Sequence, residues 1–373
     1  MKLKNLFLIG LVLVAILGIY AACHWLIWFS AVAFFGISGL SAKITLAAVL
    51  FLLAFSYLAT SVVTHFFNNA LTRKLYFAAA FWMGLVDNLV LALAIVWLAW
   101  VLLPALQGAT VAAVFGTVAF VGALAFSVWG VHNAQHPIVK KISVPIADLP
   151  EHWKGKKIVQ LSDIHLGYVY REKFMTDIAR RVKALKPDVI VITGDLFDGH
   201  DGDLVWVGKC LTKLTAPHGV FYVTGNHETY LGVDEVEDIL VKTNIVDLHD
   251  TFVDLDGLQL VGVDYPLRAE HKDVADVIGK MPLSKSKPRI LLYHAPVQIE
   301  QIKKTGVALQ LSGHTHAGQQ FPFRLVSRIV YKGYDYGLHR DGNYTLYTTT
   351  GVGTWGPPMR TGNKPEIVCV TLE

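Results

Sequence analysis

Five short clusters of metal-binding side chains occur in the second half of this chain. They contain imidazole, carboxylate and amide groups, which are ligands that Mn, Fe and Zn accept, and none contains the cysteine of a thiolate-rich zinc site. The clusters are Asp163-Ile164-His165, Gly194-Asp195-Leu196-Phe197-Asp198, Gly225-Asn226-His227-Glu228, Tyr293-His294-Ala295-Pro296 and Gly313-His314-Thr315-His316. Together these groups suffice for a site that holds two metal ions.

Each cluster directly follows an apolar run of the kind expected for a buried β-strand. The runs cover residues 158–161, 189–192, 220–223, 290–292 and 308–311. Continuous apolar runs are typical of strands buried on both faces, and open α/β sheets bind their ligands beyond the carboxyl ends of the strands. The sequence therefore predicts that all five clusters meet at one rim.

Amphipathic segments alternate with these strands. Residues 172–185 have apolar side chains at helical spacing and end before Lys186-Pro187, and residues 205–214 and 235–243 repeat the pattern. Strand–helix–strand units of this length imply parallel pairing in a layered α/β domain. Towards the C-terminus, 344–350 and 366–372 are predicted strands with no helix between them. An α/β fold with a two-sheet β-sandwich flanked by helices fits these elements best.

The order of the clusters resembles the signature of the calcineurin-like metallophosphoesterases. Asp-x-His, Gly-Asp-x-x-Asp, Gly-Asn-His-Glu, an isolated His and Gly-His-x-His are all intact, and the resemblance covers roughly residues 156–373. Any one of these motifs is common by chance, whereas five in order, each after a strand, are not. The tail 351–360 also resembles a bacterial branch of the family whose members are secreted or membrane-attached.

The resemblance implies a role for each site residue. Seven residues would bind metal: Asp163, His165 and His316 one ion, Asn226, His294 and His314 the other, and Asp195 both. His227 would stand beside the ions as a catalytic acid, with Asp198 as its orienting partner. Arg360 is a candidate for a bidentate phosphate contact, and the alternative is a surface arginine after two prolines. Glycines at 194, 225 and 313 would let the backbone turn sharply before a ligand.

A site of this kind predicts the hydrolysis of a phosphate ester. Two ions about 3.5–4 Å apart would polarise the phosphoryl oxygens and hold a bridging hydroxide for in-line attack, and a protonated His227 would give its proton to the leaving alkoxide. Phosphodiesters, pyrophosphates and phosphomonoesters all suit such a site. The alternative is a non-catalytic membrane sensor or scaffold that retains a metal-binding fold. That alternative predicts lost ligands or a lost acid histidine, and all are present.

The first third of the chain is far more apolar than the rest. Hydrophobic residues make up 53% of the 373 residues and charged residues 17%, and the apolar excess lies almost wholly before residue 135. Apolar stretches at about 5–28, 44–67, 75–103 and 109–131 are each long enough to cross a hydrocarbon core of roughly 30 Å. We therefore predict a four-helix transmembrane bundle over 1–136, a basic linker over 137–157 and a metallophosphoesterase domain over 158–373.

The basic residues of this region predict an orientation in the cell membrane. Four spans place both ends of the bundle on one side, and six basic residues would share that side: Lys2, Lys4, Arg73, Lys74, Lys140 and Lys141. Only Lys43 would lie opposite, so the bias in Lys and Arg puts the catalytic domain of this multi-pass protein in the cytoplasm. A fifth span hidden in residues 23–42 is the alternative, and it would reverse the orientation.

Two features favour a lipid-linked phosphate ester as substrate. The bundle tethers the site near a lipid surface, and a basic-apolar stretch follows the last ligand cluster. Its basic residues are Arg324, Arg328 and Lys332, and its apolar residues are Phe321, Phe323, Leu325, Val326, Ile329, Val330 and Tyr331. Such a stretch can lie in a membrane interface, and the alternative is that it packs beneath the sheet. We expect no nucleic-acid partner, because the net charge of +4 forms no basic stripe.

Overall fold

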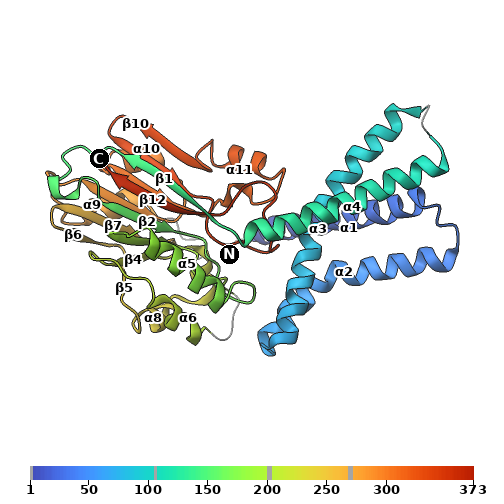
Figure 1. Cartoon of the computed structure of the whole chain (residues 1–373), viewed down its shortest axis with the longest axis horizontal. Helices are drawn as coiled ribbons and strands as arrows, with labels where there is room; N and C mark the ends of the chain where they lie inside the picture. The colour runs from blue at the N-terminus through green and yellow to red at the C-terminus, as the bar shows by residue number, and fades with distance from the viewer. Residues whose placement is uncertain (1–2, 105–106, 200–203, 268–271) are drawn as a thin grey trace. The chain divides into compact units, whose positions relative to one another are not determined.

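The computed structural model describes residues 3–104, 107–199, 204–267 and 272–373 (Figure 1). The chain divides into two compact units. One comprises Met1–Gly130 with Pro357–Met359, and the other comprises Val131–Gly356 with Arg360–Glu373. The two units are described separately below.

Four long helices make up most of the first unit. They are α1 (Leu3–Phe34), α2 (Leu40–Phe66), α3 (Ala70–Leu102) and α4 (Ala109–Ala134). Residues Gly10–Phe34 of α1 and the whole of the other three are long and apolar enough to cross a membrane, which confirms the predicted number of spans. No separate fifth helix occurs within 23–42, because α1 runs unbroken to Phe34 and α2 begins at Leu40.

The interior of this helical unit is apolar with a few paired polar groups. Buried side chains such as Leu89 and Leu93 form its centre. Asn88 donates its Nδ2 hydrogen to Ser127 Oγ over 2.8 Å, which joins α3 to α4. Many other large apolar side chains point outwards, as expected for helices that face lipid.

The second unit contains two six-stranded sheets. The first sheet has the order β1 (Ile138–Val144), β12 (Glu366–Leu372), β2 (Lys157–Leu161), β3 (Val189–Thr193), β4 (Val220–Val223) and β5 (Ile245–Asp247). The second has the order β10 (Gly337–Asp341), β11 (Tyr344–Thr348), β9 (Leu309–Ser312), β8 (Arg289–Tyr293), β7 (Leu258–Val263) and β6 (Thr251–Leu255). One apolar core, which includes Ile158, Val191, Leu292 and Leu311, draws side chains from both sheets.

Helices cover the outer face of each sheet. The first sheet packs against α5 (Glu172–Ala184), α6 (Val205–Leu211) and α8 (Val233–Leu240). The second packs against α9 (Val274–Lys280) and α10 (Ile299–Lys303). The structure therefore confirms the predicted two-sheet sandwich flanked by helices. The remaining elements are the short helices α7 (Asn226–Leu231), α11 (Arg324–Val330), η2 (Glu151–Trp153) and η3 (His316–Gly318).

The segment predicted as a basic linker, 137–157, is instead part of the folded second unit. Within it, β1 pairs in parallel with β12 along its whole length, from Ile138 opposite Glu366 to Val144 opposite Leu372. Trp153 is fully buried and donates its Nε1 hydrogen to Leu255 O over 2.9 Å. Lys140 and Lys141 of this segment lie in β1, which is an edge strand, and solvated basic side chains are common on edge strands because they discourage pairing with other chains.

The strands that precede the predicted ligands are aligned within their sheets. The pairs β2–β3 and β3–β4 are parallel, and so is the pair β8–β9. Parallel pairing brings the carboxyl ends of neighbouring strands to the same edge of a sheet. The loops after these five strands begin at that edge, which is where the candidate site is found.

Candidate metal centre

The five sequence clusters come together in the structure. Three overlapping groups have ligand atoms within 4.8 Å of one another: Asp163 with His165 and His316, His165 with Asp195 and His227, and Asp195 with His294 and His314. The Asn226 side chain adjoins the last group, because its Oδ1 lies 3.2 Å from His294 Nε2. All seven predicted metal ligands, and His227, therefore lie in one cluster.

Asp195 lies between the two ends of this cluster. Its Oδ2 is 3.2 Å from His294 Nε2 and 3.9 Å from His165 Nε2. On the far side of His165, the Nε2 atoms of His165 and His316 are 3.1 Å apart, and both rings are buried. Ring nitrogens and carboxylate oxygens that converge in this way fit a divalent cation of the Mn, Fe or Zn type.

Most of the predicted ligand residues have an unusual backbone conformation. Five of them have φ in the left-handed region: Asp163 (51°), His165 (50°), Asp195 (49°), His314 (72°) and His316 (47°). Such a conformation costs a non-glycine residue of order 1–3 kcal/mol and persists only where the surrounding structure enforces it. The chain thus bends sharply just after each of three strands, β2, β3 and β9, and presents its side chains to the cluster.

Three glycines allow these loops to approach one another. Gly194 has φ of +83°, so its predicted role in a sharp turn agrees with the structure. At Gly225 and Gly313 the requirement is instead that no side chain is present. A Cβ atom at Gly225 would overlap the carboxylate of Asp195, and one at Gly313 would overlap that of Asp163.

Burial and mutual charge set the protonation of the ligands. Burial, together with the neighbouring charge of His294, lowers the pKa of His314 to about 3, and burial with the charge of His165 holds the pKa of His316 well below its usual value. Burial alone would also lower the pKa of His294, but the Asp195 carboxylate outweighs it and raises that pKa to about 9. Because metal binds neutral imidazole, His314 and His316 are ready to ligate, whereas His294 must first release a proton.

Asp198 contacts His227 through its backbone rather than its carboxylate. His227 Nδ1 donates to the Asp198 carbonyl oxygen over 2.7 Å, while Asp198 Oδ1 lies 3.4 Å from His165 Nδ1. Burial and the nearby charge of His165 lower the pKa of His227. His227 and Asp198 are therefore neighbours, as the sequence predicted. The Asp198 carboxylate, however, faces His165, which is a predicted metal ligand.

Arg360 lies inside the domain, fully buried, and not on its surface. Its guanidinium donates to Gly353 O, to Thr350 O over 2.6 Å and to Asn363 Oδ1 over 2.7 Å, and its Nη2 is 3.1 Å from His316 Nδ1. Burial lowers the pKa of Arg360 to about 10, so the group stays charged at neutral pH. These contacts favour a role in positioning His316 and the 350–363 loop over the predicted contact with phosphate.

We expect Arg360→Lys to weaken metal binding and to lower the free energy of unfolding by roughly 2–3 kcal/mol, because lysine leaves several buried acceptors unpaired. The KM for a soluble phosphate ester should stay near the wild-type value. Thermal unfolding, metal titration and steady-state kinetics would measure these effects, with the exposed Arg180→Lys as control. A raised KM with unchanged stability would instead indicate a phosphate contact.

Glu228 organises the site in a way that the sequence analysis missed. Its carboxylate accepts hydrogen bonds from the backbone N–H groups of Asp195 (3.0 Å), Phe197 (3.1 Å) and Gly225 (2.6 Å). Burial and the charge of Asp195 raise its pKa to about 7. Glu228 thus ties the loop after β3 to the start of α7. The available signal was an acid three residues after a glycine N-cap, which is half of a capping box.

Glu228→Gln is expected to weaken metal binding by roughly 10–100-fold, as is typical when a group that supports metal ligands is changed. An amide in place of the carboxylate turns one acceptor into a donor that faces backbone N–H groups. Turnover at saturating metal should fall much less than metal affinity. Isothermal metal titration would test this against Glu237→Gln on the exposed face of α8, and equal affinities for the two variants would contradict it.

Aromatic side chains surround the metal cluster. The Tyr265 ring lies 5.8 Å from His294 and 5.7 Å from His314, and the Tyr331 ring lies 6.0 Å from His314. On the other side, the Trp355 ring lies 6.0 Å from that of His227. A ligand bound at the cluster would therefore meet aromatic as well as polar groups.

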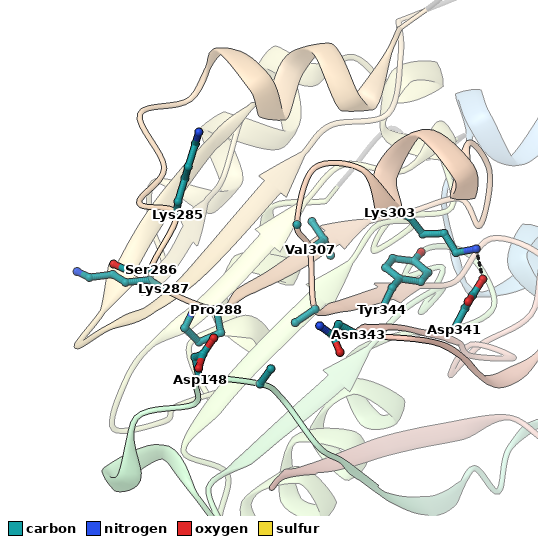
Figure 2. Close-up of a pocket in the computed structure, with 13 residues that line it drawn as sticks. Asp148, Lys285, Ser286, Lys287, Pro288, Lys303, Val307, Asp341, Asn343 and Tyr344 are labelled. Atoms are coloured by element: carbon teal, nitrogen blue, oxygen red, sulfur yellow. Dashed lines mark hydrogen bonds and ion pairs between the residues drawn. The ribbon is translucent and has the colours of Figure 1, made fainter.

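A cavity lies in another part of the domain. It has a volume of about 360 Å³ and is lined in part by Lys287, Lys303 and Tyr344, as Figure 2 shows. Its walls include residues just before β8 and β9, whereas the predicted metal ligands His294, His314 and His316 follow the carboxyl ends of these strands. Lys303 pairs with Asp341, and Lys287 pairs with Asp254. Two of the three lysines that line this cavity are therefore already paired with carboxylates.

Comparisons with known proteins agree with this geometry. Residues 156–318 match the family model of the calcineurin-like phosphoesterases. An uncharacterized metallophosphoesterase of Campylobacter jejuni is 39% identical over 252 residues, which cover 65% of each chain. One from Aquifex aeolicus is 36% identical over 245 residues, 63% of this chain and 91% of that one. A Danio rerio transmembrane protein with metallophosphoesterase domain is 33% identical over 267 residues, 66% of this chain and 60% of that one.

This chain belongs to the calcineurin-like metallophosphoesterase family. Its four apolar helices precede the family domain. The chain spans about 60–65% of the length of the Campylobacter and Danio relatives.

Proposed function

We propose that this protein is a membrane-anchored phosphoric ester hydrolase that uses two divalent ions, Mn, Fe or Zn. The main support is the convergence of seven side chains with nitrogen or oxygen donor atoms, among them the Asp195 carboxylate that two of the groups share. When bound, such ions polarise phosphoryl oxygens, generate a nucleophile from water and offset the charge of the transition state. The complete set of ligands, with His227 beside it, gives no support to a non-catalytic sensor or scaffold.

The proposed roles follow the position of each side chain. Asp163, His165 and His316 would hold one ion, Asn226, His294 and His314 the other, and Asp195 both. His227 would act as the catalytic acid. Its Nδ1 hydrogen is donated to the Asp198 carbonyl, so a proton for the leaving oxygen would come from Nε2. Asp198, Glu228 and Arg360 would position these groups.

The substrate we propose is a phosphodiester, a pyrophosphate or a phosphomonoester, with preference for a lipid-linked ester. Four helices that can cross a membrane tie the site to a bilayer, which supports that preference. The bias in basic residues supports a cytoplasmic catalytic domain. We propose no nucleic-acid partner, since the net charge of +4 is spread along the chain.

The test is a screen of the full-length protein in nanodiscs. Protein stripped with a chelator and reloaded with Mn, Fe or Zn would be assayed on mono-, di- and pyrophosphate esters, in lipid-linked and water-soluble forms. We expect hydrolysis of at least one class that depends on added metal, and faster hydrolysis of the lipid-linked form. No metal-dependent hydrolysis of any class would refute the proposed activity, and equal rates on both forms would remove the preference for lipid.

A further inference from the structure

Helix α11 and the turn before it present apolar side chains to solvent. Six of them are between 44% and 78% exposed, and together they are called the α11 surface: Phe321, Phe323, Leu325, Val326, Ile329 and Val330. The only buried residue of α11 is Ser327. The alternative that this stretch packs beneath the sheet is therefore wrong for these six side chains.

An exposed apolar surface of this kind is expected to bind a partner. Burial of large aliphatic and aromatic side chains is favourable, so six left in water represent a substantial driving force for association. Contiguous exposed apolar side chains on a soluble domain mark sites of interaction with a protein or a membrane. The charges around the surface distinguish between these two.

The charges on this segment are all positive. Residues 321–334 contain Arg324, Arg328 and Lys332 and no acidic residue, and all three basic side chains are exposed. The Arg324 guanidinium also lies over the Tyr336 ring, 5.6 Å from its centroid. Basic residues near the anionic surface of a membrane are attracted to it. Apolar side chains interleaved with basic ones are the composition of helices that lie in a membrane interface.

We infer that the α11 surface inserts into the interface of a lipid bilayer. The same chain carries four helices that can cross a membrane, so a bilayer is tethered to the domain that bears this surface. No other partner has to be supplied. Insertion would bury the six apolar side chains among acyl chains and leave the basic groups at the level of the headgroups.

The α11 surface adjoins the metal centre along the chain and in space. The Tyr331 ring, one residue beyond α11, is 6.0 Å from the ring of His314. Thr315, between the ligands His314 and His316, donates its hydroxyl hydrogen to Asp335 O over 2.6 Å. On the basis of the proposed function, a phosphate ester carried by a lipid would have only a short distance to travel from the interface to the metals.

Spin labelling of the full-length protein tests the insertion without any need for activity. With the native cysteines changed to alanine, nitroxides would be attached at Ile329→Cys and, as a matched control, at Val241→Cys. Val241 follows α8 and is 79% exposed, so it is an equally apolar position outside the α11 surface. The measurement is how often each label collides with oxygen, which is enriched in the bilayer, and with a nickel chelate, which stays in water. In nanodiscs of phosphatidylcholine and phosphatidylglycerol, we expect the Ile329 label to collide more often with oxygen and the Val241 label more often with the chelate.

A kinetic experiment tests whether insertion speeds the hydrolysis of a lipid-linked substrate. The double variant Ile329→Glu, Val330→Glu should hydrolyse a diacylglycerol-linked nitrophenyl phosphodiester in the same nanodiscs roughly 10-fold more slowly, because loss of about 1.4 kcal/mol of membrane binding corresponds to that factor. Its rate on soluble bis-p-nitrophenyl phosphate should be unchanged.

The outcomes separate this inference from the proposed activity. Equal water exposure of the two labels, in protein that still hydrolyses the soluble ester, would overturn insertion and leave the activity standing. Spin–spin broadening at Ile329 that disappears on dilution with unlabelled protein would overturn it in favour of a second copy of the chain. A lipid-exposed Ile329 label in protein that hydrolyses no ester would support insertion and refute the activity.

Discussion

Asp195→Asn is expected to abolish both metal retention and turnover. The Asp195 carboxylate lies 3.2 Å from His294 Nε2 and 3.9 Å from His165 Nε2, so it is the side chain that the two halves of the cluster share. Burial would raise its pKa, but the charge of His294 outweighs burial and keeps that pKa well below the usual value. An amide in this place removes the negative charge that would offset the charge of the two proposed cations.

The expected loss in kcat/KM is at least about 10³-fold. Stabilisation by a metal that acts as a Lewis acid is worth several kcal/mol, and about 4 kcal/mol corresponds to this factor. Elemental analysis of the purified variant should find less than the wild-type metal content. The control is Asp177→Asn, a half-exposed carboxylate on α5 that pairs with Arg180. A variant at Asp195 that keeps its metal and its rate would remove the basis of the proposed function.

His227→Ala is expected to keep its metal and to lose turnover selectively. The ring is buried next to the cluster, and its Nδ1 donates to the Asp198 carbonyl, which fixes its orientation. A general acid contributes about 10²–10⁴-fold when the leaving group needs a proton. We therefore expect a loss in this range for alkyl phosphodiesters, and a much smaller loss for nitrophenyl esters, whose leaving group departs without protonation.

Leaving-group dependence is the measurement that separates this role from that of a metal ligand. Rates for a series of aryl and alkyl esters should fall more steeply with leaving-group pKa in His227→Ala than in the wild type, while elemental analysis shows equal metal. His152→Ala, at an exposed position in η2, serves as control. His227 does lie within 4.8 Å of His165 and Asp195 ligand atoms. Loss of metal together with a uniform loss of rate would therefore assign it to the ligand set.

Much of the fold could be predicted because its signals are local. A run such as Val189-Ile190-Val191-Ile192 followed by Gly194-Asp195 contains both the strand and the turn that ends it, and β3 runs from Val189 to Thr193 as expected. The four apolar helices could be predicted in the same way, since their length and hydropathy are properties of continuous segments. The order of the ligand motifs was likewise sufficient to indicate the family.

The features that could not be predicted depend on contacts between distant residues. Strand β1 is defined by its pairing with β12, more than 200 residues further along the chain, and without this partner its lysines resemble a linker. Burial of Arg360 depends on the position of His316, and the role of Glu228 depends on the loop that holds Asp195. The left-handed backbone at five ligand residues is likewise imposed by neighbours rather than by residue type.

Short-range apolar patterning and motif order were therefore enough to predict which side chains gather at the candidate site and which strands precede them. The contacts that hold these residues became visible in the folded domain alone. It showed that the Asp198 carboxylate faces His165, that Arg360 is buried behind His316, and that the apolar residues of α11 point outwards. Burial and hydrogen-bond pairing are properties of the whole packed domain, so no local pattern of residues could have specified them.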